Sequence, residues 1–251
     1  MLKNILLIIN PQNDFCNKNG SLYIEHSEQD IENICSLIQT KHQLFDKICV
    51  VLDTHLMHDI ASPYPWVDNN GNHPKPYTIL DKNGIDKSTG VEYHNYSNYI
   101  DYREYLIEHY KNNRTPLIIW PHHCIIGTWG HNIVDKLQKV LYINDKLPVW
   151  YKLTGHEVYR DNYNTVEDFK TLFKDDEPSV NLYICGESKS HSVYQSVKHI
   201  ITMNVCRNNR IIYVLQDCTS SIKGFQKTTD ENYIKLADHS LIKLIKSTDV
   251  K

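Results

Sequence analysis

Short runs of β-branched and other apolar residues alternate along this chain with longer segments that have helical spacing of their apolar residues. This alternation is typical of a mostly parallel sheet with helices on both faces. We therefore predict an α/β fold with three layers, α/β/α, around a six-stranded, mostly parallel sheet. The predicted strands are 4–9, 47–52, 116–120, 148–152, 181–185 and 210–215. The predicted helices are 28–43, 98–112, 131–141, 165–174, 190–203 and 228–246.

The length of the chain and one long irregular segment indicate how it is organised. A chain of 251 residues can form one large α/β domain with a well buried core, and we expect a single domain over 1–251. The segment 54–97 is a long loop insertion in this prediction, because it has several prolines and glycines and no sustained periodicity. Loops of that length tend to be lids or binding loops, and a decorated surface insertion is the alternative.

Composition excludes some classes of partner. The net charge is −3, with both signs scattered along the chain, so there is no basic face for nucleic acid or for an anionic membrane. The apolar run Ile5–Ile9 is too short to span a membrane and is not followed by a cleavage site. The seven cysteines are odd in number and lack CxxC spacing, which argues against a disulfide framework. We expect a soluble, cytoplasmic protein whose partners are small molecules or proteins.

A carboxylate and an imidazole follow the second predicted strand, in "VVLDTHLMH". Asp53 and His55 are two residues apart, so both side chains leave the strand end on the same face. Such a pair suits Zn²⁺, Fe²⁺ or Mn²⁺, and a hydrogen-bonded structural pair is the alternative. His58 and Asp59 are further candidates for the surroundings of the same site.

Two adjacent histidines follow the third predicted strand, in "IIWPHHC". Because adjacent side chains point in different directions, we expect one of His122 and His123 to be a ligand and the other a bystander. Together with Asp53 and His55, one of them gives three protein ligands and leaves open positions. That arrangement is typical of a reactive or substrate-binding metal rather than a closed structural one.

Two other strand ends carry candidate catalytic residues. In "LYICGESKSHSVYQSV" a buried strand runs through a tight turn into a helix, which is the geometry of a nucleophile elbow with Ser192 as the candidate. In the alternative, Ser190 caps the helix and Ser192 is an ordinary residue of its first turn. Lys152 ends an apolar strand and either extends to solvent or lies beside a site, where its charge would lower neighbouring pKa values.

The first predicted strand ends at Asn10, in "NILLIINPQNDFC". Strand ends of this kind usually carry a catalytic side chain, but an amide neither takes nor gives a proton at neutral pH. Together, "NPQNDF", Asp53 with His55, "WPHHC", Lys152 and "GESKSHS" resemble the isochorismatase-like cysteine hydrolases, and within them the nicotinamidases, over nearly the whole chain and in the right order. The resemblance implies an isochorismatase-like, Rossmann-like hydrolase fold.

The resemblance also implies roles for individual residues. It implies a divalent metal ion, Zn²⁺ before Fe²⁺ or Mn²⁺, held by Asp53, His55 and His123 rather than His122. It puts Asn10, Lys152 and Ser192 at the positions of the catalytic triad, Ser188 and Ser192 at the oxyanion site, and Phe15 and Trp120 against the substrate. It implies a non-proline cis peptide at Glu187–Ser188. The implied ligand is a small aromatic amide or acid such as nicotinamide or nicotinate, and the implied assembly is a homo-oligomer.

Two of the three triad positions depart from the family, which has aspartate where this chain has Asn10 and cysteine where it has Ser192. A serine needs stronger activation than a thiol, and Asn10 cannot act as a base. We therefore expect an inactive or strongly impaired amidohydrolase that keeps its metal and its pocket. Three alternatives remain: an active amide or ester hydrolase that uses Ser192 with Lys152, an oligomeric scaffold or regulatory protein, and a variant designed to trap a substrate, since both replacements are nearly isosteric.

Overall fold

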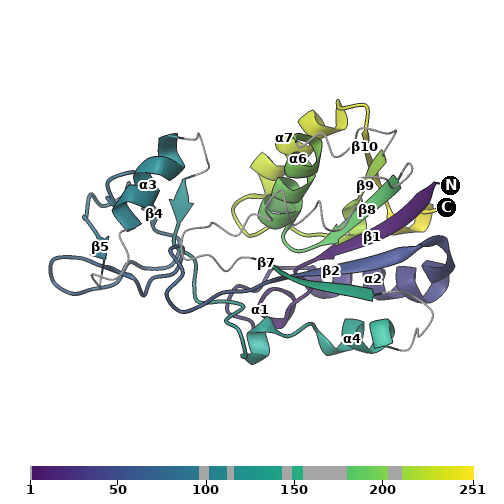
Figure 1. Ribbon diagram of the computed structural model, residues 1–251, viewed down its shortest axis with the longest axis horizontal. Helices are drawn as coiled ribbons and strands as arrows, with labels where there is room; N and C mark the ends of the chain where they lie inside the picture. Colours follow the sequence, from purple (N-terminus) through teal and green to yellow (C-terminus); the bar gives the residue numbers. More distant parts are fainter. Residues whose placement is uncertain (1, 96–101, 112–115, 143–148, 155–179, 203–210) are drawn as a thin grey trace.

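The computed structural model describes residues 2–95, 102–111, 116–142, 149–154, 180–202 and 211–251, and the statements below concern these residues. Their centre is a six-stranded sheet in the order β10-β9-β8-β1-β2-β7, with every neighbouring pair parallel (Figure 1). The predicted α/β fold around a mostly parallel sheet is confirmed. The strands are β1 Lys3–Ile9, β2 Lys47–Asp53, β7 Val149–Thr154, β8 Val180–Gly186, β9 Ile211–Leu215 and β10 Ile242–Ile245.

Helices cover both faces of this sheet because its strands are apolar on both sides. In β1, Leu6 and Ile8 belong to one buried cluster, while Ile5, Leu7 and Ile9 belong to another. Successive side chains of a strand point to opposite faces, so these clusters are the two sides of the sheet. The first cluster includes residues of α2 (Ser27–Lys41) and α4 (Asp135–Tyr142), and the second includes residues of α6 (Tyr194–Thr202) and α7 (Gln226–Ala237).

A third buried cluster lies in the region that precedes α4 in the chain. It contains apolar residues between Ile60 and Ile119, including Trp66, Tyr102 and Leu106. The elements here are β3 (Trp66–Val67) paired with β5 (His94–Asn95), β4 (Ile79–Leu80) paired with β6 (Leu117–Ile118), and α3 (Tyr102–Lys111). Figure 1 shows α3, β4 and β5 on one side of the molecule, apart from the helices that cover the central sheet. The predicted loop insertion 54–97 contributes much of this region.

Two predicted elements are wrong, and both errors concern the sixth strand of the central sheet. The predicted strand 116–120 does not enter the central sheet: only β6 forms there, and it pairs antiparallel with β4. The predicted helix 228–246 ends early, because α7 stops at Ala237 and Ile242–Ile245 forms β10. The sixth strand of the sheet is therefore β10, which pairs in parallel with β9, and not 116–120.

The other predicted helices are shifted or subdivided. Helix 28–43 corresponds to α2 and the 3₁₀ turn η1 (His42–Leu44), and 98–112 corresponds to α3. Helix 131–141 begins later than predicted, since the 3₁₀ turn η2 (Trp129–His131) precedes α4. Helix 190–203 corresponds to a π-helical turn, η3 (Lys189–Val193), followed by α6. The predicted helix 165–174 lies outside the described residues.

The remaining short elements are α1 (Asn13–Cys16), η4 (Gln216–Cys218) and η5 (Ser247–Asp249). In the view of Figure 1 both ends of the chain lie on the side of the molecule opposite to α3 and β5. Cysteines 16, 35, 49, 124, 185 and 218 are free and buried. Among the described helices, none combines the length and apolar composition needed to cross a membrane.

Candidate active site

The carboxyl ends of β1, β2 and β8 meet at one edge of the sheet, and polar residues follow each of them. Asn10 comes directly after β1, and its backbone N–H donates to the carbonyl of Val51 at 2.8 Å. The φ angle of Asn10 is 48°, in the left-handed region that asparagine and aspartate tolerate better than most residues. This turn of the backbone lets the chain leave the sheet while the Asn10 side chain stays buried at its edge.

Asn10 and Ser192 are hydrogen-bonded across 182 residues of sequence. The Nδ2 atom of Asn10 donates to the Oγ atom of Ser192 at 3.1 Å. Ser192 lies in η3, directly after the turn that ends β8. The structure therefore brings together the two positions at which this sequence departs from the cysteine hydrolases. In this hydrogen bond the Asn10 amide is the donor, whereas a catalytic base would accept the proton of the Ser192 hydroxyl.

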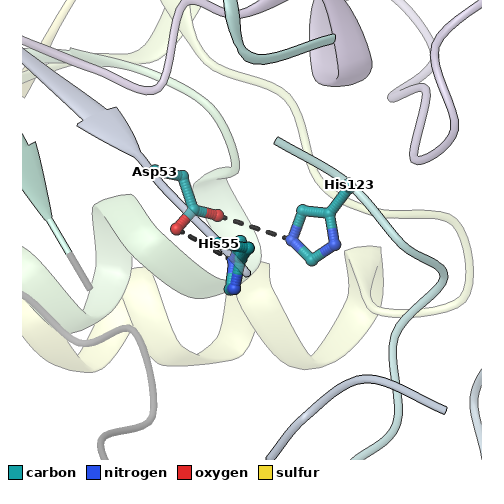
Figure 2. A group of neighbouring side chains, drawn as sticks. All are labelled: Asp53, His55 and His123. Carbon is teal, nitrogen blue, oxygen red and sulfur yellow. Dashed lines mark ion pairs between the residues drawn. The ribbon is translucent and has the colours of Figure 1, made fainter. Parts of the chain in front are cut away.

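Asp53, His55 and His123 form a compact buried cluster (Figure 2). The Nε2 atom of His55 lies 3.1 Å from Oδ1 of Asp53, and that of His123 lies 3.4 Å from Oδ2. One ligand atom from each residue lies within 4.8 Å of the other two. Asp53 ends β2 and His55 follows it, whereas His123 comes from the segment after β6.

The hydrogen bonds behind the two histidines fit a cation in this cluster. Nδ1 of His55 lies 2.7 Å from Oδ2 of Asp59, and Nδ1 of His123 lies 2.7 Å from the carbonyl of Pro121. With Nδ1–H donating outward, each ring directs the lone pair of Nε2 towards Asp53, as in metal sites where a carboxylate or carbonyl orients a histidine ligand. Among the described residues, Oδ1 of Asp53 is buried and accepts no hydrogen bond, although Nε2 of His55 lies 3.1 Å from it. Two imidazole nitrogens and a carboxylate oxygen suit Zn²⁺, and also Fe²⁺ or Mn²⁺.

The electrostatics of the metal-free cluster point the same way. Burial raises the pKa of Asp53, but the charge of His55 and a hydrogen bond from His123 outweigh it and hold that pKa below its usual range. Burial lowers the pKa of His55, but Asp53 and then Asp59 outweigh it and raise that pKa to about 10. Positive charge is thus strongly favoured beside Asp53, and a divalent cation would supply it.

The two neighbouring histidines lie elsewhere. Burial, followed by the charges of His123 and His73, lowers the pKa of His122, and Nδ1 of His122 has no hydrogen-bond partner among the described residues. His58 packs edge-on against Tyr64, with ring centroids 4.8 Å apart. Of the residues proposed around the pair Asp53 and His55, it is Asp59 that touches the cluster.

Gln12 holds the end of β2 in place. Its Nε2 atom donates to the carbonyl of Asp53 at 2.7 Å, and its Oε1 atom accepts from the N–H of Asp53 at the same distance. Nε2 also donates to the carbonyl of His131 at 2.9 Å. The side chain of Gln12 is fully buried, so these backbone groups have little access to water. The sequence alone does not predict this role of Gln12.

Asp14 holds the other side of the cluster. Its Oδ2 atom accepts from the N–H of Cys124, the residue after His123, at 2.6 Å. Its Oδ1 atom accepts from the N–H of Ser21 at 3.0 Å. A Cβ atom at Gly130 would lie 2.0 Å from Oδ2 of Asp14, so only glycine leaves room for this carboxylate. The "NPQNDF" segment therefore supports the cluster through two backbone clamps.

A cavity of about 270 Å³ adjoins the cluster and the serine. Its lining includes Asp53 and His123 from the cluster, Ser188 and Ser192 from the turn after β8, and the aromatic residues Phe15 and Trp120. The rings of Phe15 and His123 meet edge to face, with centroids 5.5 Å apart. Of the residues to which the resemblance gave a role and whose side chains are described, all except Asn10 and His55 line this cavity. Those two residues contact residues that line it.

His191 lines the same cavity but does not reach Ser192. Its Nδ1 atom lies 2.9 Å from Oγ of Ser190, and its ring meets those of Trp120 and Phe225 edge-on. Burial lowers the pKa of His191 to about 4, so the ring is neutral at physiological pH. The described contacts of His191 therefore support Ser190 rather than a proton transfer at Ser192.

Two further predicted features lie beside the cavity. The peptide bond Glu187–Ser188 is cis, as the resemblance implied. The backbone N–H of Ser188 has no hydrogen-bond partner among the described residues. Lys152 lies in β7 opposite Val51, two residues before Asp53 on the neighbouring strand, and its side chain lies outside the described part of the structure.

Comparisons with known proteins agree with this geometry. No protein-family model matches the chain. A nicotinamidase of Saccharomyces cerevisiae is 26% identical over 192 residues, which are 75% of this chain and 76% of that protein. The crystal structure of the yeast nicotinamidase bound to the inhibitor nicotinaldehyde matches with a TM-score of 0.67 and 20% identity, over 97% of this chain and 99% of that one.

A pyrazinamidase of Pyrococcus horikoshii in complex with zinc matches with a TM-score of 0.56 and 15% identity, over 97% of this chain and 99% of that one. The structural matches establish the fold, and the sequence match establishes a relative. The resemblance drawn from the sequence is confirmed at this level. The chain has the fold of the nicotinamidases and pyrazinamidases, and it is a homologue of a yeast nicotinamidase.

Proposed function

We propose that this protein binds a divalent metal ion, and beside it a small aromatic amide or acid, and that it hydrolyses amides poorly or not at all. The observation that carries the proposal is the hydrogen bond from Asn10 to Ser192 at the wall of the cavity next to Asp53, His55 and His123. The binding side of a nicotinamidase site is retained in this arrangement. The base and the thiol of the reaction are replaced by groups of nearly the same shape.

Chemistry supports the impaired step. A serine hydroxyl attacks a carbonyl only when a base removes its proton, and the group that reaches Oγ of Ser192 is an amide N–H donor. Catalytic residues that act as a unit have non-additive effects, so replacing both the base and the nucleophile lowers the rate about as much as replacing one of them. The backbone N–H groups of Ser188 and Ser192 remain as oxyanion donors in this proposal, because they do not depend on the side chain.

The ligand class rests on the relatives and on the cavity. The yeast nicotinamidase was crystallised with nicotinaldehyde, and the pyrazinamidase of Pyrococcus horikoshii was crystallised in complex with zinc. In the proposed site Asp53, His55 and His123 hold the metal, Zn²⁺ first, and the ion supplies a Lewis acid that can bind a ring nitrogen. Phe15 and Trp120 offer aromatic surface to a pyridine ring, so nicotinamide and nicotinate are the ligands that we would try first.

The deciding experiment restores the missing groups. Four proteins are compared: the chain as it stands, Asn10→Asp, Ser192→Cys, and the double variant, each loaded with zinc. We expect ammonia release from nicotinamide to stay near background in the first three and to rise by about two orders of magnitude or more in the double variant. Adding His123→Ala to the double variant should abolish the gain.

Three results would overturn the proposal. Substantial turnover by the unaltered chain would show that Asn10 and Ser192 do not impair hydrolysis. A folded, zinc-loaded double variant that neither binds nicotinate nor releases ammonia would show that the cavity is not a nicotinamidase pocket. Failure of the purified protein to take up zinc would favour the scaffold or regulatory role instead.

A second candidate is a hydrolase that uses Ser192 with Lys152. The position of Lys152 in β7, opposite Val51, favours it, because that register puts this residue near the end of β2 that carries Asp53. In this candidate a neutral lysine removes the proton of Ser192, and the absence of a carboxylate at position 10 makes that neutral form easier to reach. An activated ester that adds mass to Ser192, with loss of the adduct in Lys152→Met, would support this candidate.

A further inference from the structure

Two carboxyl groups lie buried beneath the turn that carries Ser188 and Ser192. Glu187, at the start of this turn, has no exposed surface, and Asp30, in α2, is 6% exposed. The two residues come from different layers of the fold, because α2 covers one face of the sheet while β8 lies within it. Buried carboxyl groups are rare unless they are paired with a cation or neutralised.

The contacts of the pair leave one proton unaccounted for. Oε2 of Glu187 accepts from the backbone N–H of Ser220 at 3.3 Å. Oε1 of Glu187 and Oδ2 of Asp30 are buried and receive no hydrogen bond from any donor among the described residues. Yet the two side chains lie within hydrogen-bonding reach of one another. Ionised carboxylates only accept hydrogen bonds, so a bond between them requires a proton on one of the two.

We propose that Asp30 and Glu187 share one proton, and that the resulting hydrogen bond positions the 187–192 turn at the wall of the cavity. The pair is a positioning device and touches neither metal nor substrate. It does not rest on the proposed function, because it would hold the turn in an active or an inactive protein.

The surroundings of the pair agree with a bound proton. Burial, followed by the charge of Asp30, raises the pKa of Glu187 well above its usual value. Burial also raises the pKa of Asp30, although hydrogen bonds from Ser220 and Glu187 and the charge of His26 oppose this. The pair therefore resembles two carboxyl groups that cannot both ionise at short range.

The other titratable groups near the pair do not replace the proton. They are Cys16 of α1, Cys185 of β8, Asp217 of η4, and His26 and Glu28 at the start of α2. Burial raises the pKa values of Cys16 and Cys185 well above the usual value, so both thiols are neutral. Asp217 and Glu28 are acids, and of these groups only His26, which is exposed, can carry a positive charge.

Backbone contacts link the pair to the site. The N–H of Glu187 donates to the carbonyl of Ile9, the residue before Asn10, at 2.7 Å. The N–H of Lys189 donates to the carbonyl of Ser220 at 2.8 Å, so Ser220 braces the turn at two points. The hydrogen bond between Glu187 and Asp30 links the 187–192 turn to α2, and the backbone hydrogen bonds do not provide this link.

Infrared spectroscopy tests the proton directly. We expect the full chain at neutral pH to show the carbonyl band of a protonated carboxyl group, and Glu187→Gln and Asp30→Asn each to lose it. Glu25→Gln, which removes an exposed carboxylate near the start of α2, should keep the band. A spectrum without the band, or a band that survives in both Glu187→Gln and Asp30→Asn, would overturn the proposal.

The pH dependence of folding stability is a second test of the shared proton. Above the ordinary glutamate pKa of ~4.3 the unfolded chain loses a proton that the folded chain keeps, so stability falls as the pH rises. The folding constant of the full chain should therefore fall about tenfold per pH unit relative to that of Glu187→Gln, until the pair itself ionises. Parallel pH profiles of the two proteins would contradict the shared proton.

Hydrogen exchange separates positioning from stability. Glutamine keeps a donor for Asp30, whereas Glu187→Leu removes it. We expect the hydrogen-bonded amides of Lys189, His191 and Val193 to stay protected up to alkaline pH in Glu187→Gln, to lose protection at alkaline pH in the full chain, and to be poorly protected at every pH in Glu187→Leu. If Glu187→Leu protected the turn as well as Glu187→Gln does, the positioning role would be wrong.

Discussion

At the scale of single residues, Gln12 and Asp14 act on the candidate metal cluster through the backbone. Gln12 accepts from and donates to the main chain of Asp53, and Asp14 accepts from the N–H that follows His123. Neither side chain belongs to the cluster of Asp53, His55 and His123. Each fixes the backbone from which a candidate ligand extends, and such supporting contacts commonly change metal affinity by about 10-fold to 100-fold.

Gln12→Met tests this support, because methionine nearly matches the length of glutamine but forms none of its hydrogen bonds. We expect zinc affinity, measured by competition with a chelating dye, to fall by about 10-fold or more. The free energy of unfolding should fall by about 1–3 kcal/mol, since the N–H and carbonyl of Asp53 lose a buried partner. Gln29→Met changes an exposed glutamine of α2 and should alter neither quantity. Unchanged zinc affinity in Gln12→Met would contradict the clamp.

Sequence reasoning reached the cluster but not its supports. Asp53, His55 and His123 follow strand-like runs, and strand ends of an α/β sheet converge, so their proximity could be predicted. The hydrogen-bond partner of Gln12 could not be predicted, because nothing in "NPQNDF" indicates which backbone groups its buried amide will contact. The same limit applies to Glu187, an acidic residue that the fold buries completely.

At the scale of helices and strands, local pattern failed where only tertiary pairing decides the outcome. The residues of 116–120 form a strand-like run, yet Leu117 and Ile119 pack in the third cluster rather than in the central sheet. The segment 242–245 continued an apparent helix, yet it adds to the open edge of β9. The structure of short apolar runs is hard to predict because their periodicity does not show which segment they will pair with.

The last turn of the chain depends on one lysine of α2. The Nζ atom of Lys41 donates to the carbonyls of Ser247, Thr248 and Val250, at 3.3, 2.7 and 2.9 Å. These carbonyls belong to η5 and the residue after it, and one residue, Lys246, separates η5 from β10. The ammonium group therefore holds the end of the chain to the sheet from the neighbouring helix.

Lys41→Met should loosen this end without disturbing the site. Hydrogen bonds from a charged donor contribute about 1.5–3 kcal/mol, so we expect the free energy of unfolding to fall by about 1–3 kcal/mol. Hydrogen exchange should quicken at the amides of 247–250 and stay slow in β1 and β8. Lys82→Met, at an exposed lysine, is the control and should leave both measurements as they are. Equal exchange at 247–250 in the two variants would contradict the role of Lys41.

At the scale of the whole molecule, the candidate metal cluster joins the central sheet to the region of the third buried cluster. Asp53 and His55 extend from β2, while His123 follows the segment that packs with Ile60 and Trp66. Backbone bonds already link the two parts, since His55 donates to the carbonyl of Cys124 at 3.0 Å. A cation held by all three side chains would add a tie between them.

Zinc should therefore stabilise the folded protein as a whole. A ligand that binds only the folded state at 100 times its dissociation constant adds about 2.7 kcal/mol to the free energy of unfolding. We expect zinc to raise the unfolding midpoint of the full chain and a chelator to reverse the rise. Asp53→Asn should remove most of the zinc effect, because the amide carries no negative charge. His58→Gln alters an exposed histidine near the cluster that packs against Tyr64, and it should keep the effect in full. An equal gain in Asp53→Asn and in the full chain would mean that zinc binds somewhere other than this cluster, and the tie between the two parts of the molecule would then have to be sought in the backbone bonds alone.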